Sequence, residues 1–410
     1  MDVKTVNELL SRGEIDREDM WPHLAEMESK ALQFRFEFGL DRLPMEPGLI
    51  TIRGPRQYGK STWLDMNLRR SVQDFGGGSS FYLNGDELAS PEDLAREMTA
   101  LYSAYSPKAK IRRLFIDEIT AISEWEKAIK RLVDQGLYRD VLIVSTGSKA
   151  TDLRRGSERL PGRKGRLKKS EYIFLPISYR EFDRVSGPEL GKDKWKAYLL
   201  TGGSPIALND IGQFGHLPDY FLQLTRDWIL GEVIQSGRSR VFLSQLLRTL
   251  LKYGGQPVGY AKLSREAGLA NNTVAAGYIE QLSDLLCVMP SWAWDSNNKT
   301  LQLRKPCKFH FINLAAVVAF HPAALRSIHE FEMLPPEARG QFLEWMVAQE
   351  IWRRAVLAGD SNPEAVGYWS SKEHEIDFVS PGQEFIEVKL GRASPLDFAW
   401  FEKVFPKSKL

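Results

Sequence analysis

The segment Gly54-Pro55-Arg56-Gln57-Tyr58-Gly59-Lys60-Ser61 constrains the fold more than any other part of the chain. It has the form G-x-x-x-x-G-K-S, follows a short apolar run at 49–52 and precedes a helical pattern at 62–70. In such a strand–loop–helix unit, the glycines let backbone N–H groups curl around a polyphosphate, and the helix amino terminus adds partial positive charge. We expect the loop and Thr62 to bind ATP, with Lys60 reaching the β- and γ-phosphates and Ser61 ligating Mg²⁺.

Length and composition describe an ordinary globular chain. The 410 residues are 43% hydrophobic and 26% charged, with a formal net charge of +2, and this length predicts two to three domains. No segment is apolar over the length that a bilayer requires, and the polar amino terminus does not resemble a secretory signal. Cys287 and Cys307 form no C-x-x-C or Cys/His pattern, so we expect a reducing cytoplasm, no zinc site and no membrane partner.

The pattern along the chain predicts an α/β fold with several parts. A leader at 1–45 has helical character, although its alternating apolar residues at 32–40 equally fit a short extended stretch. Residues 46–185 alternate apolar runs with amphipathic helices, which is typical of a parallel sheet. Strands are expected at 49–53, 80–83, 112–116, 141–146 and 171–175. We expect a helical linker at 186–250, a winged-helix-like domain at 251–335 and a small α/β domain at 336–410.

Two of these strands end in residues suited to nucleotide hydrolysis. The strand at 112–116 leads directly into Asp117 and Glu118. Asp117 is expected to hold Mg²⁺ directly or through water, and Glu118 to orient and polarise the attacking water. The strand at 141–146 ends in small polar residues, of which Thr146 or Ser148 could face the γ-phosphate. An ordinary turn at the end of a strand is the alternative for these two residues.

Together these motifs resemble a widespread prokaryotic family of AAA+ ATPases. The resemblance rests on GPRQYGKST, LFIDEI and STGS, on LPGRKG at 160–165 and LPISYREF at 175–182, and on the Gly-Gly-Ser-Pro run at 202–205. It covers most of residues 48–395. It implies an AAA+ sheet in which the strand at 141–146 lies between the other two. Members commonly carry a winged helix and a restriction-endonuclease-like C-terminal domain, and the family implies no settled biological role.

A run of basic residues follows the third of these motifs. It consists of Arg154, Arg155, Arg159, Arg163, Lys164, Arg166, Lys168 and Lys169. A solvated loop is one interpretation. In another, Arg163 lies in the segment that resembles the family's Gly-Arg motif and acts as an arginine finger toward a neighbouring subunit, which requires a homo-oligomer. In a third, the run contacts nucleic-acid phosphates.

Residues 257–285 have the pattern of a helix-turn-helix. A first helix is expected at 261–267, a turn at 268–269, and a second helix that Asn272 or Thr273 caps and that continues to 285. Asn271, Asn272, Thr273 and Tyr278 would then face a major groove of DNA, with Lys262 and Arg265 near phosphates. The alternative is a packing module that never touches DNA. Small residues in the second helix predict weak or nonspecific contact.

The C-terminal part contains a D-x(n)-E-x-K pattern, formed by Asp377, Glu387 and Lys389. Residues two apart on a strand share a face, so Glu387 and Lys389 are expected to lie beside Asp377 on a paired strand. The two carboxylates could hold Mg²⁺ while Lys389 activates a hydroxide or stabilises the reacting phosphate. Glu344 is the better candidate for a helical acid that completes such a nuclease site, and Glu350 is the reserve. A cross-strand salt bridge is the alternative. We expect a single helix at about 394–405 after this pattern.

The sequence thus predicts a cytoplasmic, Mg²⁺-dependent AAA+ ATPase that forms a homo-oligomer and acts on DNA, with a C-terminal domain of nuclease-like layout. The alternative is a signalling or defence switch in which nucleotide controls assembly and the C-terminal domain is a non-catalytic scaffold. A P-loop kinase or GTPase is disfavoured, because no guanine-reading N-K-x-D occurs and the acidic pair 117–118 favours water attack.

Overall fold

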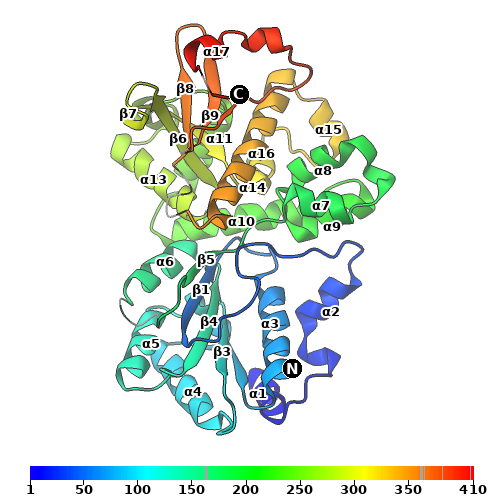
Figure 1. Cartoon of the computed structure of the whole chain (residues 1–410), viewed down its shortest axis with the longest axis vertical. Helices are drawn as coiled ribbons and strands as arrows, with labels where there is room; N and C mark the ends of the chain where they lie inside the picture. Colours follow the sequence, from blue (N-terminus) through cyan, green and yellow to red (C-terminus); the bar gives the residue numbers. More distant parts are fainter. Residues whose placement is uncertain (161, 163–164, 361–362, 364, 381, 407) are drawn as a thin grey trace. The chain divides into compact units, whose positions relative to one another are not determined.

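The structure is a computed structural model that describes residues 1–160, 162, 165–360, 363, 365–380, 382–406 and 408–410. The chain divides into two compact units, Met1–Ile177 and Ser178–Leu410. The division lies near the limit predicted for the ATPase core at 185, and the limits predicted at 45, 250 and 335 fall inside the two units. Each unit is described by itself below and can be followed in Figure 1.

The first unit contains a five-stranded parallel sheet of order β2-β3-β4-β1-β5. Its strands match the predicted positions to within two residues: β1 (Gly48–Arg53), β2 (Ser80–Asn84), β3 (Arg112–Asp117), β4 (Val141–Gly147) and β5 (Glu171–Ile173). Every residue of β4 is buried, as expected of a central strand covered on both faces. Since β4 lies between β1 and β3, the residues that follow these three strands meet at one edge of the sheet.

Helices cover this sheet, with α3 on one side and α5 and α6 on the other (Figure 1). Helices connect each strand of this sheet to the next one along the chain, which is the usual crossover between parallel strands. The helices of this unit are α1 (Val3–Arg12), η1 (Glu18–Met20), α2 (Pro22–Ser29), α3 (Lys60–Phe75), η2 (Gly85–Glu87), α4 (Pro91–Ala104), η3 (Ile119–Ala121), α5 (Trp125–Asp134) and α6 (Ala150–Glu158).

The first part of the leader is mainly helical. Its helices α1, η1 and α2 lie within residues 3–29, and residues 30–47 have neither helix nor strand. Phe38 is buried in this second part, and its ring lies 5.2 Å from that of Trp63 on α3 and 4.8 Å from that of Phe174. On α1, the Asn7 side chain donates to the Tyr82 carbonyl (2.7 Å) and accepts from the Tyr82 N–H (2.8 Å). It thereby satisfies backbone groups on β2, an edge strand that would otherwise present them to another chain.

The second unit begins with helices and continues with a mixed sheet. Its helices are α7 (Tyr179–Val185), η4 (Pro188–Asp193), α8 (Lys194–Thr201), α9 (Pro205–Phe214), α10 (Asp219–Gln235), α11 (Arg240–Lys252), α12 (Tyr260–Glu266), α13 (Asn272–Asp284), α14 (Leu314–Phe320), α15 (Ile328–Glu332), α16 (Pro336–Leu357), η5 (Pro395–Phe398) and α17 (Phe401–Val404). The single helix expected at about 394–405 is wrong, because η5 and α17 are two short pieces separated at 399–400.

The sheet of this unit joins strands from both sides of residue 335. Its order is β10-β9-β8-β6-β7, formed by β6 (Val288–Asp295), β7 (Thr300–Phe311), β8 (Gly367–Ser370), β9 (Glu375–Val379) and β10 (Phe385–Ile386). Strands β6 and β7 form an antiparallel hairpin, and β6 pairs with β8 in parallel. The pairs β8–β9 and β9–β10 are antiparallel. Residues on β7 and β9 therefore belong to one continuous sheet.

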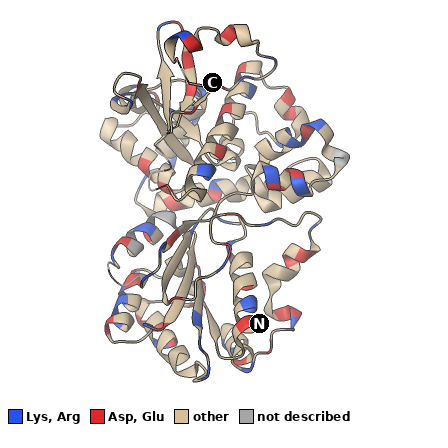
Figure 2. Cartoon of the chain, in the orientation of Figure 1, with Lys and Arg blue, Asp and Glu red and all other residues tan. Residues whose placement is uncertain are grey.

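Charges of both signs are interspersed along the helices and loops of each unit (Figure 2). Within the described parts of the chain, no helix has the length and apolar character needed to cross a bilayer.

Candidate functional site

The phosphate-binding loop lies between the end of β1 and the start of α3. Gly59 precedes α3 with φ 98° and ψ 19°, a left-handed conformation that favours glycine. A Cβ atom on Gly59 would lie 2.6 Å from ring carbons of Phe36 in the leader. The N-cap residue Gly59 has no side chain that could cap α3, and a helix amino terminus of this kind attracts an anion. Both the backbone conformation and the packing of the leader therefore require glycine at this position.

Lys60 is buried in this loop. Its Nζ donates to the carbonyl oxygens of Gly54 (3.0 Å) and Pro55 (2.8 Å). The lysine thus closes the loop on itself, and a bound phosphate would compete with these carbonyls for the ammonium group. Ser61 and Thr62 follow in the first turn of α3, where both are partly buried.

Four residues at the ends of β3 and β4 form one hydrogen-bonded network. The Thr146 hydroxyl donates to Oδ1 of buried Asp117, and the Glu118 N–H lies 3.1 Å from both the Thr146 hydroxyl and Asp117 Oδ1. The Ser148 N–H donates to Glu118 Oε2 (3.0 Å), and the Ser148 hydroxyl accepts from Arg56 Nε of the loop (3.2 Å). Thr146 and Ser148 are therefore both part of the network: Thr146 orients the acids, and Ser148 joins Glu118 to the loop.

Glu118 has an unusual backbone conformation, with φ 46° and ψ 44°. Left-handed geometry in a residue other than glycine costs on the order of 1 kcal/mol and is often found at functional sites. Here it turns the chain out of β3 so that the Glu118 carboxylate reaches the N–H group after β4. This arrangement fixes one oxygen of the acid that we expected to orient water.

The structure adds Asp65, which the sequence interpretation missed. Asp65 lies one turn after Ser61 on α3, is buried, and its Oδ2 accepts no hydrogen bond from a described residue. Burial first, and the Asp117 charge second, raise its pKa to about 8. The spacing of four residues from Ser61 was the only signal in the sequence, because it places both side chains on one helix face.

The donors at this edge of the sheet fit Mg²⁺. The Ser61 hydroxyl and the Asp117 carboxylate are the hard oxygen ligands that this ion prefers. None of the ion pairs formed by the described residues involves Asp117 or Asp65.

The basic run is only partly described. Arg163, the proposed finger, and Lys164 lie outside the described residues. Of the others, Arg159 forms an ion pair with Glu126 (2.7 Å), and Lys169 lies over the Tyr172 ring at 4.9 Å. These contacts hold part of the run against the surface of the first unit.

The predicted helix-turn-helix corresponds to α12 and α13. Asn271, rather than Asn272 or Thr273, caps α13, because its side chain accepts from the Val274 N–H (3.0 Å). Asn271, Asn272 and Thr273 are exposed, as are Lys262 and Arg265 on α12.

The prediction that Tyr278 faces a groove is wrong. Its side chain is buried, its hydroxyl accepts from the Ser239 N–H (3.0 Å), and Arg238 lies over its ring at 4.8 Å. The phase of α13 turns this position toward residues 238–239, just before α11.

The acids of the C-terminal pattern converge in the second unit. The Asp377 N–H donates to Glu387 Oε2 (3.2 Å), and Asp377 Oδ2 accepts from the Val388 N–H (2.9 Å). Lys389 forms an ion pair with Glu387 at 2.6 Å. Glu344 on α16 joins this group, whereas Glu350 pairs with Arg353 (3.2 Å).

The expectation that Glu387 and Lys389 lie on a strand is wrong. Strand β10 ends at Ile386, and side chains replace the backbone ladder beyond it. The Asp377 carboxylate takes the N–H of Val388, and the Glu387 carboxylate takes the N–H of Asp377. These side-chain bonds keep the segment beside β9.

Lys308, which the sequence interpretation also missed, lies among these acids. It is fully buried on β7, and its Nζ forms ion pairs with Asp377 (3.1 Å), Glu344 (3.5 Å) and Glu375. Burial raises the pKa of Glu344 to about 7, against the opposing effect of Lys308. The cluster does not fit a divalent metal as it stands, because an ammonium group already lies among its carboxylates. Within the described residues, no group of three His, Cys, Asp or Glu side chains is arranged to hold a metal.

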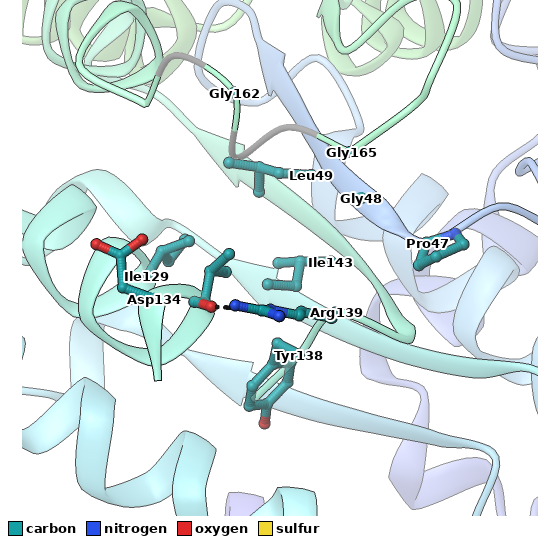
Figure 3. Close-up of a pocket in the computed structure, with 11 residues that line it drawn as sticks. Pro47, Gly48, Leu49, Ile129, Asp134, Tyr138, Arg139, Ile143, Gly162 and Gly165 are labelled. Carbon is teal, nitrogen blue, oxygen red and sulfur yellow. Dashed lines mark hydrogen bonds between the residues drawn. The ribbon is translucent and has the colours of Figure 1, made fainter. Parts of the chain in front are cut away.

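A pocket of about 460 Å³ lies elsewhere in the first unit (Figure 3). Its wall includes Gly48 and Leu49 at the start of β1, Tyr138 and Ile143, and Arg139, whose Nε donates to the Val133 carbonyl (3.4 Å). The phosphate loop follows the opposite end of β1. This pocket is therefore not the nucleotide site.

Comparison with known proteins shows a similarity over part of the chain. Residues 46–183 match a family model described as an AAA domain, which supports ATPase activity for this part. An uncharacterized protein of Methanocaldococcus jannaschii is 22% identical over 360 residues, which cover 82% of this chain and 73% of that protein.

Solved structures show only a weak likeness. A Walker-type ATPase of Pyrococcus abyssi has a TM-score of 0.45 at 15% identity, over 76% of this chain and 97% of that one. The ORC1 protein of Aeropyrum pernix, in complex with DNA, has a TM-score of 0.34 at 16% identity, over 77% and 95%. These values are too low to transfer an activity or a partner.

Proposed function

We propose that the first unit binds ATP with Mg²⁺ and hydrolyses it. The observation that carries this proposal is the network of Asp117, Glu118, Thr146 and Ser148, which the Arg56 contact joins to the phosphate loop. Ser61 and Asp117 would hold Mg²⁺, which neutralises phosphate charge when bound. Lys60 would exchange its loop carbonyls for phosphate oxygens.

Glu118 is the residue that we assign to water. The Ser148 N–H fixes one of its carboxylate oxygens, so the carboxylate is oriented before substrate arrives. A preoriented carboxylate accepts the proton of an attacking water and aligns its lone pair, which contributes roughly 10²- to 10⁴-fold to a rate.

The test compares Glu118→Gln with Glu124→Gln, an exposed control glutamate that also has positive φ (56°). We expect Glu118→Gln to bind ATP normally and to hydrolyse it roughly 10²-fold more slowly or worse, and Glu124→Gln to match wild type. Hydrolysis by Glu118→Gln at the wild-type rate would remove the residue from the mechanism.

We further propose that the enzyme is a homo-oligomer in which Arg163 acts on a neighbouring subunit. The family resemblance at 160–165 supports this assignment. Arg163→Ala should lose hydrolysis but keep ATP binding. Any residual ATPase activity of this variant should not depend on protein concentration. Arg166→Ala is the matched control. Normal hydrolysis by Arg163→Ala would show that it is not the finger.

DNA is the partner that we propose, bound by a winged helix formed by α11, α12, α13 and the hairpin β6–β7. The exposed polar start of α13 and the exposed Lys262 and Arg265 support this proposal. Duplex, branched and single-stranded DNA should change the ATPase rate, and affinity should fall as salt rises. The double variant Lys262→Ala/Arg265→Ala should reduce the slope of log affinity against log salt concentration by about two, the value expected for the loss of two phosphate contacts.

The alternative is a switch in which nucleotide controls assembly and the C-terminal domain does not cleave DNA. The position of Lys308 among the carboxylates favours this alternative for the C-terminal domain. ATP-dependent assembly without DNA binding at low salt would support the switch. Mg²⁺-dependent cleavage that is lost in Lys389→Ala would exclude it.

A further inference from the structure

We infer that the Lys308 ammonium takes the place of a divalent metal ion in the nuclease-like cluster of the second unit, so that this cluster is held together by an internal cation. The inference concerns the C-terminal site alone and does not depend on the proposed ATPase activity. It also explains why residues in a nuclease layout can converge without forming a metal site.

The first argument is the position of the lysine. Lys308 comes from β7, at the opposite edge of the sheet from β10, and its side chain is fully buried. Its Nζ contacts acids from two other elements, Glu344 of α16 at 3.5 Å and Asp377 of β9 at 3.1 Å, and it also pairs with Glu375. A metal ion that joined a helical acid to a strand acid would have to lie in this same space.

The second argument is that the two predicted metal ligands have donors on all four carboxylate oxygens. Asp377 Oδ1 accepts from Lys308 (3.1 Å) and Oδ2 from the Val388 N–H (2.9 Å). Glu387 Oε2 accepts from the Asp377 N–H (3.2 Å), and Oε1 pairs with Lys389 (2.6 Å). Mg²⁺ requires oxygen ligands at about 2.1 Å in near-octahedral geometry, so it would have to displace these donors.

The third argument is electrostatic. Removing one partner of a buried ion pair leaves an uncompensated charge, which is strongly destabilising. Loss of the positive charge of Lys308 therefore destabilises the cluster unless another cation replaces it. Conversely, loss of the ammonium leaves Glu344, Glu375 and Asp377 without the cation that they share. These acids are not arranged as a metal site in wild type, and a divalent ion that neutralises them would draw their oxygens together. Substitution of Lys308 should convert the cluster into a metal site.

The experiment is Mn²⁺ titration, by calorimetry and by paramagnetic resonance, on nucleotide-free wild type, Lys308→Met, Lys308→Met/Asp377→Asn and Lys389→Met. We expect Lys308→Met to gain one Mn²⁺ site per chain, and Asp377→Asn to remove it. Wild type and Lys389→Met should show no site that depends on Asp377. Lys389→Met is the matched control, because it removes the other ammonium of the cluster, which is 54% exposed.

Thermal unfolding provides the second readout. Lys308→Met should unfold at a lower temperature than wild type in EDTA and recover by several degrees in Mn²⁺, whereas wild type should not respond through this site. If Lys308→Met does not fold in EDTA, the same measurements are made on Lys308→Met/Glu375→Gln. This variant has one fewer negative charge in the cluster. An Asp377-dependent Mn²⁺ site in wild type would overturn the inference. So would variants that gain no Mn²⁺ site, or that stay unfolded with and without Mn²⁺.

Discussion

The buried carboxyl group of Asp65 makes a prediction about pH that the structure quantifies. Its pKa is raised from an ordinary value of 3.8 to about 8, by burial and by the nearby Asp117. Between these two values the unfolded chain has an ionised Asp65 and the folded chain has a protonated one. The folded state then binds the extra proton, so the free energy of unfolding falls as pH rises through this window and levels off above about 8.

The size of the effect follows from the same two values. At pH 7 the protonation of Asp65 on folding costs on the order of 4 kcal/mol, and at pH 5 on the order of 2 kcal/mol. Asp65→Asn keeps the shape of the neutral acid but needs no proton. Its stability advantage over wild type should therefore grow with pH, by on the order of 1 kcal/mol per pH unit between pH 5 and 7.5.

Urea unfolding followed by circular dichroism, at several pH values between 5 and 7.5 and in EDTA, measures this difference. All other titrating groups are common to both proteins and cancel. Asp74→Asn is the control, because Asp74 lies on the same helix but is 53% exposed beside Arg70. A constant difference between Asp65→Asn and wild type would refute the reasoning, since it would show that Asp65 is ionised when folded.

Three other substitutions test how the leader packs against the phosphate loop and the sheet of the first unit. Gly59→Ala should reduce stability by about 2 kcal/mol and weaken ATP binding, because φ is 98° and the new Cβ would meet Phe36; unchanged ATP affinity by calorimetry would contradict this. Arg113→Met should cost about 2–3 kcal/mol in urea unfolding, because the buried guanidinium donates to the Ser71 hydroxyl and to two leader carbonyls. Asn7→Ala should cost about 1–2 kcal/mol and promote self-association in light scattering, because it uncovers the β2 edge.

Much of the first unit could be predicted because its signals are local. Each strand of the parallel sheet contains a short apolar run, and the loop motif depends on residues that are adjacent in sequence. Asp117, Glu118 and Thr146 each lie at the end of a recognisable strand, so their meeting at one edge of the sheet follows from the fold class. The hydrogen bonds among them were not predicted, because they depend on the left-handed backbone of Glu118.

Asp65 and Lys308 could not be predicted, for the same physical reason. A charged residue in an amphipathic pattern is normally exposed, and only the three-dimensional packing shows that it is buried. Lys308 lies near the end of a long strand, 69 residues before the Asp377 that it contacts. Tyr278 is the opposite error. An aromatic residue on a helix has no sequence signal that separates a groove-facing position from a core position, and here its ring and hydroxyl contact Arg238 and Ser239 just before α11.

The two acidic clusters differ in the one property that decides which of them takes a metal. In the second unit, an ammonium from within the fold already neutralises Glu344, Glu375 and Asp377. In the first unit, Asp65 and Asp117 form no ion pair with a described residue, and their mutual repulsion helps to keep Asp65 protonated. A metal ion binds more favourably to acids that form no ion pair than to acids that an ammonium group already neutralises. Mg²⁺ with nucleotide should therefore slow amide hydrogen exchange in α3 and at the end of β3, and leave β9 unchanged; protection of β9 in wild type would show that the second cluster binds metal after all.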